Sequence, residues 1–316
     1  MLQARALTRC YGEFKAVDNV SFSVETGEIV GLLGPNGAGK TTVMKILTGY
    51  LEPDAGSVTF DGMDLSSRRL DVQSRLGYLP ENLPVYGELS VVDYLDYAAD
   101  LKGLAGRAKR DELLRAVAAT DLAGRLSDPI NTLSRGLRQR VGVAQAILGS
   151  PSLVILDEPT NGLDPEQTRH MRALIADIAR DATVILSTHI MQEVDALCSR
   201  ALIMRAGSLA LDASLHELQA SGRLLLHTDW QGAEAALSAL AGVSAVRGRQ
   251  LQEGVFEYAL QSEGARDSRA LQAGVAKAVV DSGNNLYSLQ REKRDLETVF
   301  RQINEGAAPG EFSDAA

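Results

Sequence analysis

The chain has 316 residues, of which 45% are hydrophobic and 23% charged, as is typical of a globular protein with a full hydrophobic core. Its formal net charge of −9 argues against a nucleic-acid partner, because surfaces that bind nucleic acids are basic. The two cysteines, Cys10 and Cys198, show no metal-like spacing and predict reduced thiols, and no apolar run approaches the roughly 18 residues that span a bilayer.

The first part of the chain alternates short strands with a helix. Val20, Phe22 and Val24 alternate with polar residues, which predicts a half-buried strand. The apolar run at 28–33 predicts a strand buried on both faces, and the pattern at 41–50 predicts a helix that ends at Gly49. "GSVTFDG" then predicts an antiparallel strand between two turns.

The middle of the chain is predicted to complete a mostly parallel sheet. Helical patterns fill 91–124, and buried strands are expected at "SLVILDEP" and "ATVILSTH", with a helix at 165–180 between them. Strands that alternate with helices indicate an α/β fold with a parallel sheet. We therefore expect a helical insertion, at about 85–145, between two strands of this sheet.

The C-terminal part has a different order of elements. Strands and helices follow one another as βαββαβ, which is the ferredoxin-like pattern and predicts a small α+β domain. A last helix is expected at "DLETVFRQIN". We predict a first domain at 1–220, an accessory domain at 221–304 and a disordered tail at 305–316.

A phosphate-binding loop lies between the buried strand at 28–33 and the following helix. Its sequence, "GPNGAGKT", has the spacing of a P-loop, with strand and helix where that motif requires them. Backbone N–H groups would hold phosphate oxygens, Lys40 would add positive charge, and the Thr41 hydroxyl could bind Mg²⁺. The alternative is a glycine-rich turn, which the flanking elements disfavour. The predicted nucleotide contacts are Gly34, Pro35, Asn36, Gly37, Ala38, Gly39, Lys40, Thr41 and Thr42.

Two carboxylates follow the buried strand "SLVIL". Asp157 would hold Mg²⁺, and Glu158 would face the γ-phosphate and orient or polarise the attacking water, as acidic residues do in P-loop NTPases. Solvated carboxylates at a strand end are the alternative. Beside a phosphate loop, the pair favours nucleotide hydrolysis.

Five further motifs resemble the ATP-binding subunit of an ABC transporter in their order and spacing over residues 1–220. Tyr11 is at the position of an aromatic residue that stacks on adenine, although a core or surface tyrosine would look alike. "GYLPEN" resembles a glutamine loop, "LSRGLRQR" the LSGGQ motif, "TNGLD" a D-loop, and "STH" the end of a switch strand. The resemblance adds Glu81, Ser134, Gly136, Asp164 and His189 to the expected ATP site.

The resemblance implies a mechanism that uses two copies of the chain. Each ATP would lie between the phosphate loop of one copy and Ser134 and Gly136 of the other. Lys40, Glu158 and His189 are then the expected catalytic residues. ATP and Mg²⁺ are the expected cofactors, with metal ligands at Thr41, Asp157 and Glu81.

Two motifs depart from the pattern of the family. Glu81 stands where the glutamine loop has an amide, and Arg135 and Leu137 replace a glycine and the glutamine of LSGGQ. The charge of Arg135 could act near the γ-phosphate, or its side chain could point to solvent or to the other subunit.

The lone cassette and "YLPEN" resemble ATPases of export-type (ABC-2) permeases, including drug-export and gliding-motility systems. We therefore expect a peripheral protein on the cytoplasmic side of the plasma (inner) membrane, bound to a permease of about six spans per subunit. Leu83, Val85 and Tyr86 could form the docking patch or belong to the core of the insertion. A soluble ABC-type ATPase with a non-transport role is the alternative, and a non-catalytic regulator is disfavoured by the intact catalytic residues. The accessory domain is expected to regulate or to support dimerisation.

Overall fold

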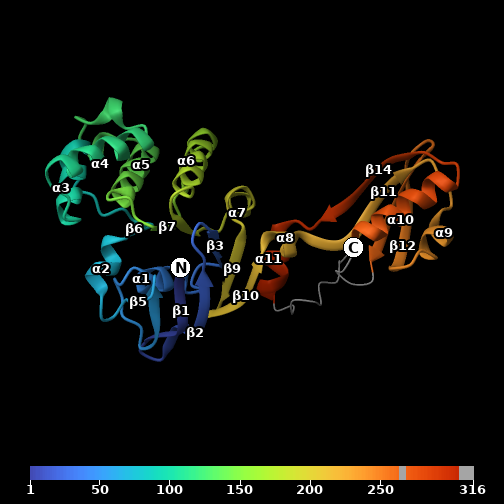
Figure 1. Ribbon diagram of the computed structural model, residues 1–316, viewed down its shortest axis with the longest axis horizontal. Helices are drawn as coiled ribbons and strands as arrows, with labels where there is room; N and C mark the ends of the chain where they lie inside the picture. Colours follow the sequence, from blue (N-terminus) through green and yellow to red (C-terminus); the bar gives the residue numbers. More distant parts are fainter. Residues whose placement is uncertain (263–267, 306–316) are drawn as a thin grey trace. The chain divides into compact units, whose positions relative to one another are not determined.

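A computed structural model describes residues 1–262 and 268–305 of the chain (Figure 1). The chain divides into two compact units, one formed by Met1–Leu215 together with the segment from Phe300 onward, and one formed by His216–Val299. Each unit is built around a hydrophobic cluster of its own.

A six-stranded sheet forms the centre of the first unit. Its strand order is β10-β9-β3-β8-β7-β6, and every pair is parallel except the antiparallel pair β9 and β10 at one edge. All five residues of β7 and of β8 are buried, as their continuous apolar sequences predicted. The strands are β3 (Ile29–Leu33), β6 (Leu76–Leu79), β7 (Leu153–Asp157), β8 (Thr183–Ser187), β9 (Arg200–Arg205) and β10 (Ser208–Ser214).

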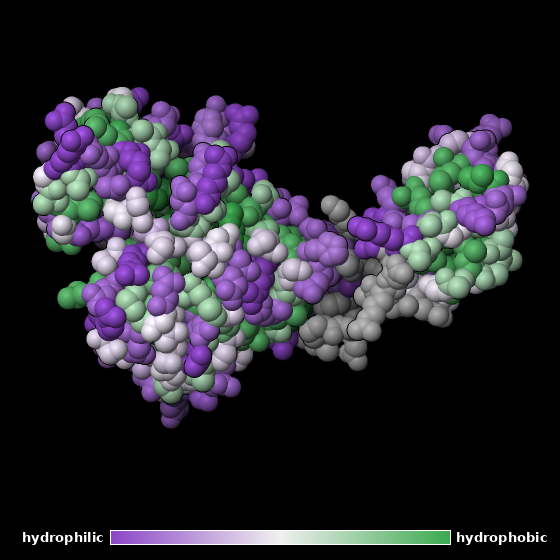
Figure 2. All heavy atoms as spheres, in the orientation of Figure 1, coloured by the Kyte–Doolittle hydropathy of each residue, from purple (hydrophilic) through white to green (hydrophobic). Residues whose placement is uncertain are grey.

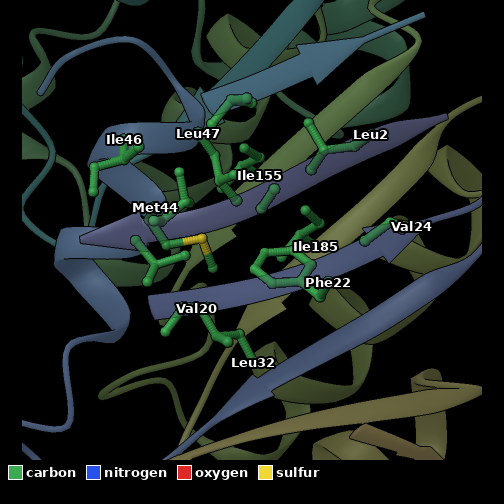
Figure 3. Packing of buried hydrophobic residues seen from close by; sticks show 14 of the residues in the cluster. Leu2, Val20, Phe22, Val24, Leu32, Met44, Ile46, Leu47, Ile155 and Ile185 are labelled. Carbon is green, nitrogen blue, oxygen red and sulfur yellow. The ribbon is translucent and has the colours of Figure 1, made fainter. Parts of the chain in front are cut away.

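An antiparallel sheet in the order β2-β1-β4-β5 shares a core with the parallel sheet. Helix α1 (Lys40–Leu47) contributes Met44 and other apolar side chains to the same cluster. Figure 3 shows side chains from these elements meeting, among them Phe22, Met44 and Ile185. The antiparallel strands are β1 (Leu2–Tyr11), β2 (Phe14–Val24), β4 (Ala55–Phe60) and β5 (Met63–Asp64).

The predicted helical insertion lies between β6 and β7, at adjacent positions of the parallel sheet. Helix α5 carries the sequence that resembles LSGGQ at its N-terminus. On α6, Met171, Leu174 and Ile175 are buried, while hydrophilic side chains cover its visible side (Figure 2). Besides α1, the helices of this unit are α2 (Arg69–Ser74), α3 (Val91–Leu101), α4 (Gly106–Ala119), α5 (Arg135–Ile147), α6 (Pro165–Ile178) and α7 (Met191–Leu197), with 3-10 turns at Ala123–Arg125 and Ile130–Thr132. Helix α8 (Leu215–Gln219) begins at the last residue of this unit and otherwise belongs to the second unit.

The second unit has the predicted βαββαβ order and an antiparallel sheet in the order β12-β13-β11-β14. Tyr258 is almost fully buried in its core, and its hydroxyl donates a hydrogen bond to the carbonyl oxygen of Trp230 at 2.7 Å. The elements are β11 (Ala220–Thr228), α9 (Glu234–Ser238), β12 (Val243–Gln252), β13 (Val255–Ser262), α10 (Ser268–Asp281) and β14 (Leu286–Lys293). This arrangement confirms the ferredoxin-like prediction.

The last helix, α11 (Leu296–Glu305), contributes a contact to the first unit, where Arg205 Nη1 donates to the carbonyl oxygen of Ile303 at 2.9 Å. The tail predicted from residue 305 lies, beyond Glu305, outside the described residues. Within 1–262 and 268–305, no helix is both long and apolar enough to cross a bilayer.

Candidate active site

The phosphate loop connects β3 to α1 and depends on glycine for its shape. Gly34, Gly37 and Gly39 have φ values of 155°, 81° and 103°, which residues with side chains rarely adopt. A Cβ atom on Gly39 would lie 2.4 Å from the carbonyl oxygen of Ala16, and one on Gly34 would lie 2.6 Å from that of Met204. The loop is therefore pressed against the backbone of two neighbouring strands, β2 and β9.

Lys40 begins helix α1, and its ammonium group is held inside the loop. Its Nζ atom donates to the carbonyl oxygens of Gly34 at 2.6 Å and Pro35 at 3.3 Å. Burial lowers the pKa of Lys40, and the carboxylates of Glu158, Asp157 and Glu81 oppose this shift. The lysine thus faces three predicted site residues and can transfer its hydrogen bonds to a phosphate.

A hollow of about 470 Å³ brings together most of the predicted nucleotide site. Two residues that sequence reasoning missed, Phe14 and Ala16, also line it. In the β1–β2 pair, Phe14 lies directly opposite Tyr11, so the two rings project from the same face of the hairpin. The lining residues are Tyr11, Phe14, Ala16, Asn36, Gly37, Ala38, Gly39, Lys40, Thr41, Thr42, Glu81, Asp157 and Glu158.

Tyr11 presents an exposed aromatic surface at this hollow. The residue is 50% exposed, and the guanidinium of Arg9 lies 5.3 Å from the ring centroid. Arg9 is fixed in turn by an ion pair with Asp54 at 2.7 Å. The ring is held by a cation–π contact and retains surface on which a planar base can stack.

Asp157, at the end of β7, fits a role as a magnesium ligand. It is 1% exposed, and its Oδ2 atom has no hydrogen-bond partner among the described residues. Burial raises the pKa of Asp157, which a divalent cation would reverse. The described residues include no group of three or more His, Cys, Asp or Glu side chains that could hold a metal ion. Nucleotide phosphates and water would therefore complete the coordination, as is usual for Mg²⁺.

Glu158 is buried and pairs with His189. Its φ of 51° lies in the left-handed region, and its backbone N–H donates to the carbonyl oxygen of Ser187 at 2.9 Å. The Nδ1 atom of His189 lies 2.9 Å from Oε2 and 3.1 Å from Oε1 of Glu158. Burial raises the pKa of Glu158, and the hydrogen bond with His189 partly offsets this shift.

Six of the predicted site residues do not line this hollow: Gly34, Pro35, Ser134, Gly136, Asp164 and His189. Ser134 caps helix α5 by accepting from the Leu137 N–H at 3.3 Å, and with Gly136 it lines a second hollow of about 310 Å³. Asp164 caps α6 and accepts from the Gln167 N–H at 2.8 Å. Within one copy of the chain, the LSGGQ-like residues are therefore separate from the phosphate loop.

Two residues depart from the LSGGQ pattern, Arg135 and Leu137, and the structure shows what each of them contacts. Arg135 is exposed, and its guanidinium occupies the space where a Cβ atom on Gly162 would lie, with Cζ 2.4 Å from that position. Leu137 is half-buried and lines the second hollow. The charge of Arg135 thus lies against the loop that follows Glu158 in the same chain.

Comparison with known proteins identifies the family. Residues 17–161 match the family model described as ABC transporter. The chain is 31% identical over 310 residues to the linearmycin resistance ATP-binding protein LnrL of Bacillus subtilis (strain 168), which covers 96% of this chain and 98% of that protein. The chain belongs to the ABC transporter ATP-binding family. As an ABC ATP-binding cassette, it is an ATPase.

Other relatives agree with this family. The chain is 34% identical over 216 residues to the Nod factor export ATP-binding protein I of Burkholderia orbicola (strain AU 1054), with 68% of this chain and 71% of that protein covered. A solved structure described as the ATP binding subunit of an ABC transporter is 30% identical, with a TM-score of 0.64, and covers 69% of this chain and 91% of that one. The ABC cassette fold thus accounts for the first unit.

Proposed function

We propose that the chain is the energy-coupling subunit of a membrane exporter, in which two copies close on ATP and drive a permease. The observation that carries this proposal is the hollow that joins Tyr11, the phosphate loop and the carboxylates of Asp157 and Glu158. In this reading, residues 1–220 form the ATPase domain, and residues 221–304 form an accessory domain that regulates it or supports the dimer.

ATP would fill this hollow from the aromatic end to the carboxylates. The adenine ring stacks on Tyr11, and the backbone N–H groups of the loop hold the phosphates together with Lys40. Thr41 and Asp157 would hold Mg²⁺, with Glu81 facing the same space, and the ion would neutralise the phosphate charge that develops during cleavage.

Glu158 is the proposed general base for hydrolysis. Its carboxylate accepts a proton from the attacking water, whose oxygen bonds to the γ-phosphorus while the bond from that phosphorus to the bridging oxygen of ADP breaks. The products are ADP and phosphate. His189, 2.9 Å from Glu158, orients the carboxylate and can contact the γ-phosphate.

The separation of the LSGGQ-like loop from the phosphate loop supports a composite site. Ser134 and Gly136 lie at the N-terminus of α5, where backbone N–H groups and the helix dipole favour a phosphate. Because they do not line their own chain's hollow, we propose that they complete the site of a second copy. Mixed dimers of Ser134→Arg and Lys40→Ala chains test this geometry, since one intact site should remain only if the motifs act across subunits.

The proposed permease would dock beside the helical insertion. Tyr86 and Tyr97 are 52% and 43% exposed and meet edge to face at 5.9 Å between ring centroids. Leu83, by contrast, packs toward Gly142 of α5, so it supports the insertion rather than the surface. The names of the two relatives, which refer to linearmycin resistance and Nod factor export, support the export direction. We place the protein peripherally on the cytoplasmic side of the plasma (inner) membrane.

Two measurements test the proposal. A tagged Glu158→Gln chain should bind ATP, lose turnover and accumulate as an ATP-bound dimer, and wild-type turnover would remove Glu158 from its role. The same chain should co-purify with a membrane protein of about six spans per subunit. Recovery with ribosomes, without any membrane protein, would indicate the soluble, non-transport alternative.

A further inference from the structure

A fully buried carboxylate connects the two loops that carry the catalytic pair. Glu193, on α7, has 0% exposure. The hydroxyl of Thr160 donates to its Oε1 atom, and the hydroxyl of Thr188 donates to its Oε2 atom at 2.9 Å. We refer to Thr160, Glu193 and Thr188 as the buried bridge.

The buried bridge joins positions next to Glu158 and His189. Thr160 follows Glu158 by two residues, and Thr188 immediately precedes His189. The Thr188 hydroxyl also accepts from the Ile190 N–H at 3.1 Å, so its single proton is directed to Glu193. Both loops are therefore fixed to the same carboxylate.

The backbone of Glu158 needs such support. A glutamate at a φ of 51° is unfavourable and persists only where the surroundings determine it. One restraint is the hydrogen bond from its N–H to the carbonyl oxygen of Ser187. The buried bridge restrains the next turn of the same loop through Thr160, so it limits how far Glu158 can relax.

Stability alone does not explain a glutamate at this place. Among the described residues, Glu193 has no ion pair, and only hydroxyl groups compensate for removing its carboxylate from water. Burial of a carboxylate is costly, and an apolar side chain would fill such a space at lower cost. The carboxylate of Glu193 instead connects the loop that follows β7 with the loop that follows β8.

We propose that Glu193 is a positioning residue for ATP hydrolysis, which orients Glu158 and His189 by tying their loops together through Thr160 and Thr188. This inference rests on the proposed role of Glu158 as the general base. Since the buried bridge contributes no residue to the phosphate-loop hollow, it should affect the chemical step more than nucleotide binding.

Matched substitutions of Thr160 in the full-length chain test the proposal. Thr160→Val keeps the shape but removes the donor, and Thr160→Ser keeps the hydroxyl. We expect Thr160→Val to lower kcat by about 10- to 100-fold, because small misplacements of catalytic groups have effects of this size. KM for ATP and the Kd of a fluorescent ATP analogue should stay within about threefold, and Thr160→Ser should retain most of kcat.

Unchanged kcat in Thr160→Val, or a loss of nucleotide affinity that matches the loss of kcat, would overturn the positioning role. If Thr160→Val does not fold, Glu193→Gln tests the same bridge, because it keeps the shape and removes one acceptor; its kcat should fall while KM holds. Glu158→Gln separates the two proposals. If it retains turnover, the general-base assignment fails, whereas if it loses turnover and Thr160→Val does not, only the bridge fails.

Discussion

Replacement of Gly39 by alanine tests the packing that shapes the phosphate loop, and Gly37→Ala is its matched control. Both glycines have positive φ, 103° and 81°, so alanine at either position costs about 1–2 kcal/mol in backbone strain. Only at Gly39 would the new Cβ meet a neighbour, the carbonyl oxygen of Ala16 at 2.4 Å, while nothing lies within 4 Å at Gly37. Relief of such an overlap typically costs a further 1–3 kcal/mol or so.

The free energy of unfolding should therefore fall by about 1–2 kcal/mol in Gly37→Ala and by about 2–5 kcal/mol in Gly39→Ala. Urea unfolding followed by far-UV circular dichroism measures both values. The fluorescence of Trp230, the single tryptophan, reports on the second unit and serves as an internal control. Equal losses in the two variants would refute the steric argument, since strain from φ alone would then explain both.

Three further predictions concern the proposed adenine site, a buried lysine and Glu158, the proposed general base. Phe14→Ala should weaken ATP binding by about 0.5–1.5 kcal/mol, because a stacking surface is lost, but leave the binding of inorganic triphosphate unchanged in calorimetry. Burial lowers the pKa of Lys102 to about 8, so the unfolded chain holds this proton to higher pH than the folded chain. The stability of the wild type relative to Lys102→Met should therefore rise by about 1.4 kcal/mol per pH unit above pH 8, and a flat difference in urea unfolding from pH 8 to 10 would contradict this. Burial raises the pKa of Glu158, so this carboxylate is protonated at a higher pH than an exposed glutamate would be. As the pH is lowered, kcat should therefore begin to fall at a higher pH than it would with an exposed glutamate as the base, which a pH–kcat profile measures.

The elements with a regular local pattern could be predicted from the sequence, and those with broken patterns could not. Strands β7 and β8 are continuous apolar runs and were found. Strand β1 was missed as a separate element because register shifts between Ala4 and Leu7, with Ala6 at a φ of 48°, break its alternation. The first helix of the predicted βαββαβ pattern, α9, is only Glu234–Ser238, although the alanine-rich segment around it is longer, since such a composition does not define where a helix ends.

The same distinction applies to the site. The phosphate loop and the carboxylates at the end of β7 are contiguous motifs, whereas Phe14 and Ala16 reach the hollow only because β2 pairs with β1. The sequence did contain an indication for Phe14, because only two residues separate it from Tyr11, which fits a tight turn that pairs the two residues. Glu193 gave no such signal, because a glutamate on a short helix is usually exposed and its burial depends on tertiary packing.

The altered LSGGQ-like loop contacts the segment that follows Glu158. Arg135 fills the space above Gly162, and a Cβ on Gly136 would lie 2.5 Å from the side-chain oxygen of Gln167, so the start of α5 is packed directly on the segment that follows β7. Thr160 fixes that segment through the buried bridge. A larger residue at Gly162 would therefore displace Arg135 and disturb the cap at Ser134, whereas a glycine at position 135 would remove the contact with Gly162 and leave the packing of Gly136 against Gln167. In this chain, the guanidinium of Arg135 therefore packs against the loop that follows β7.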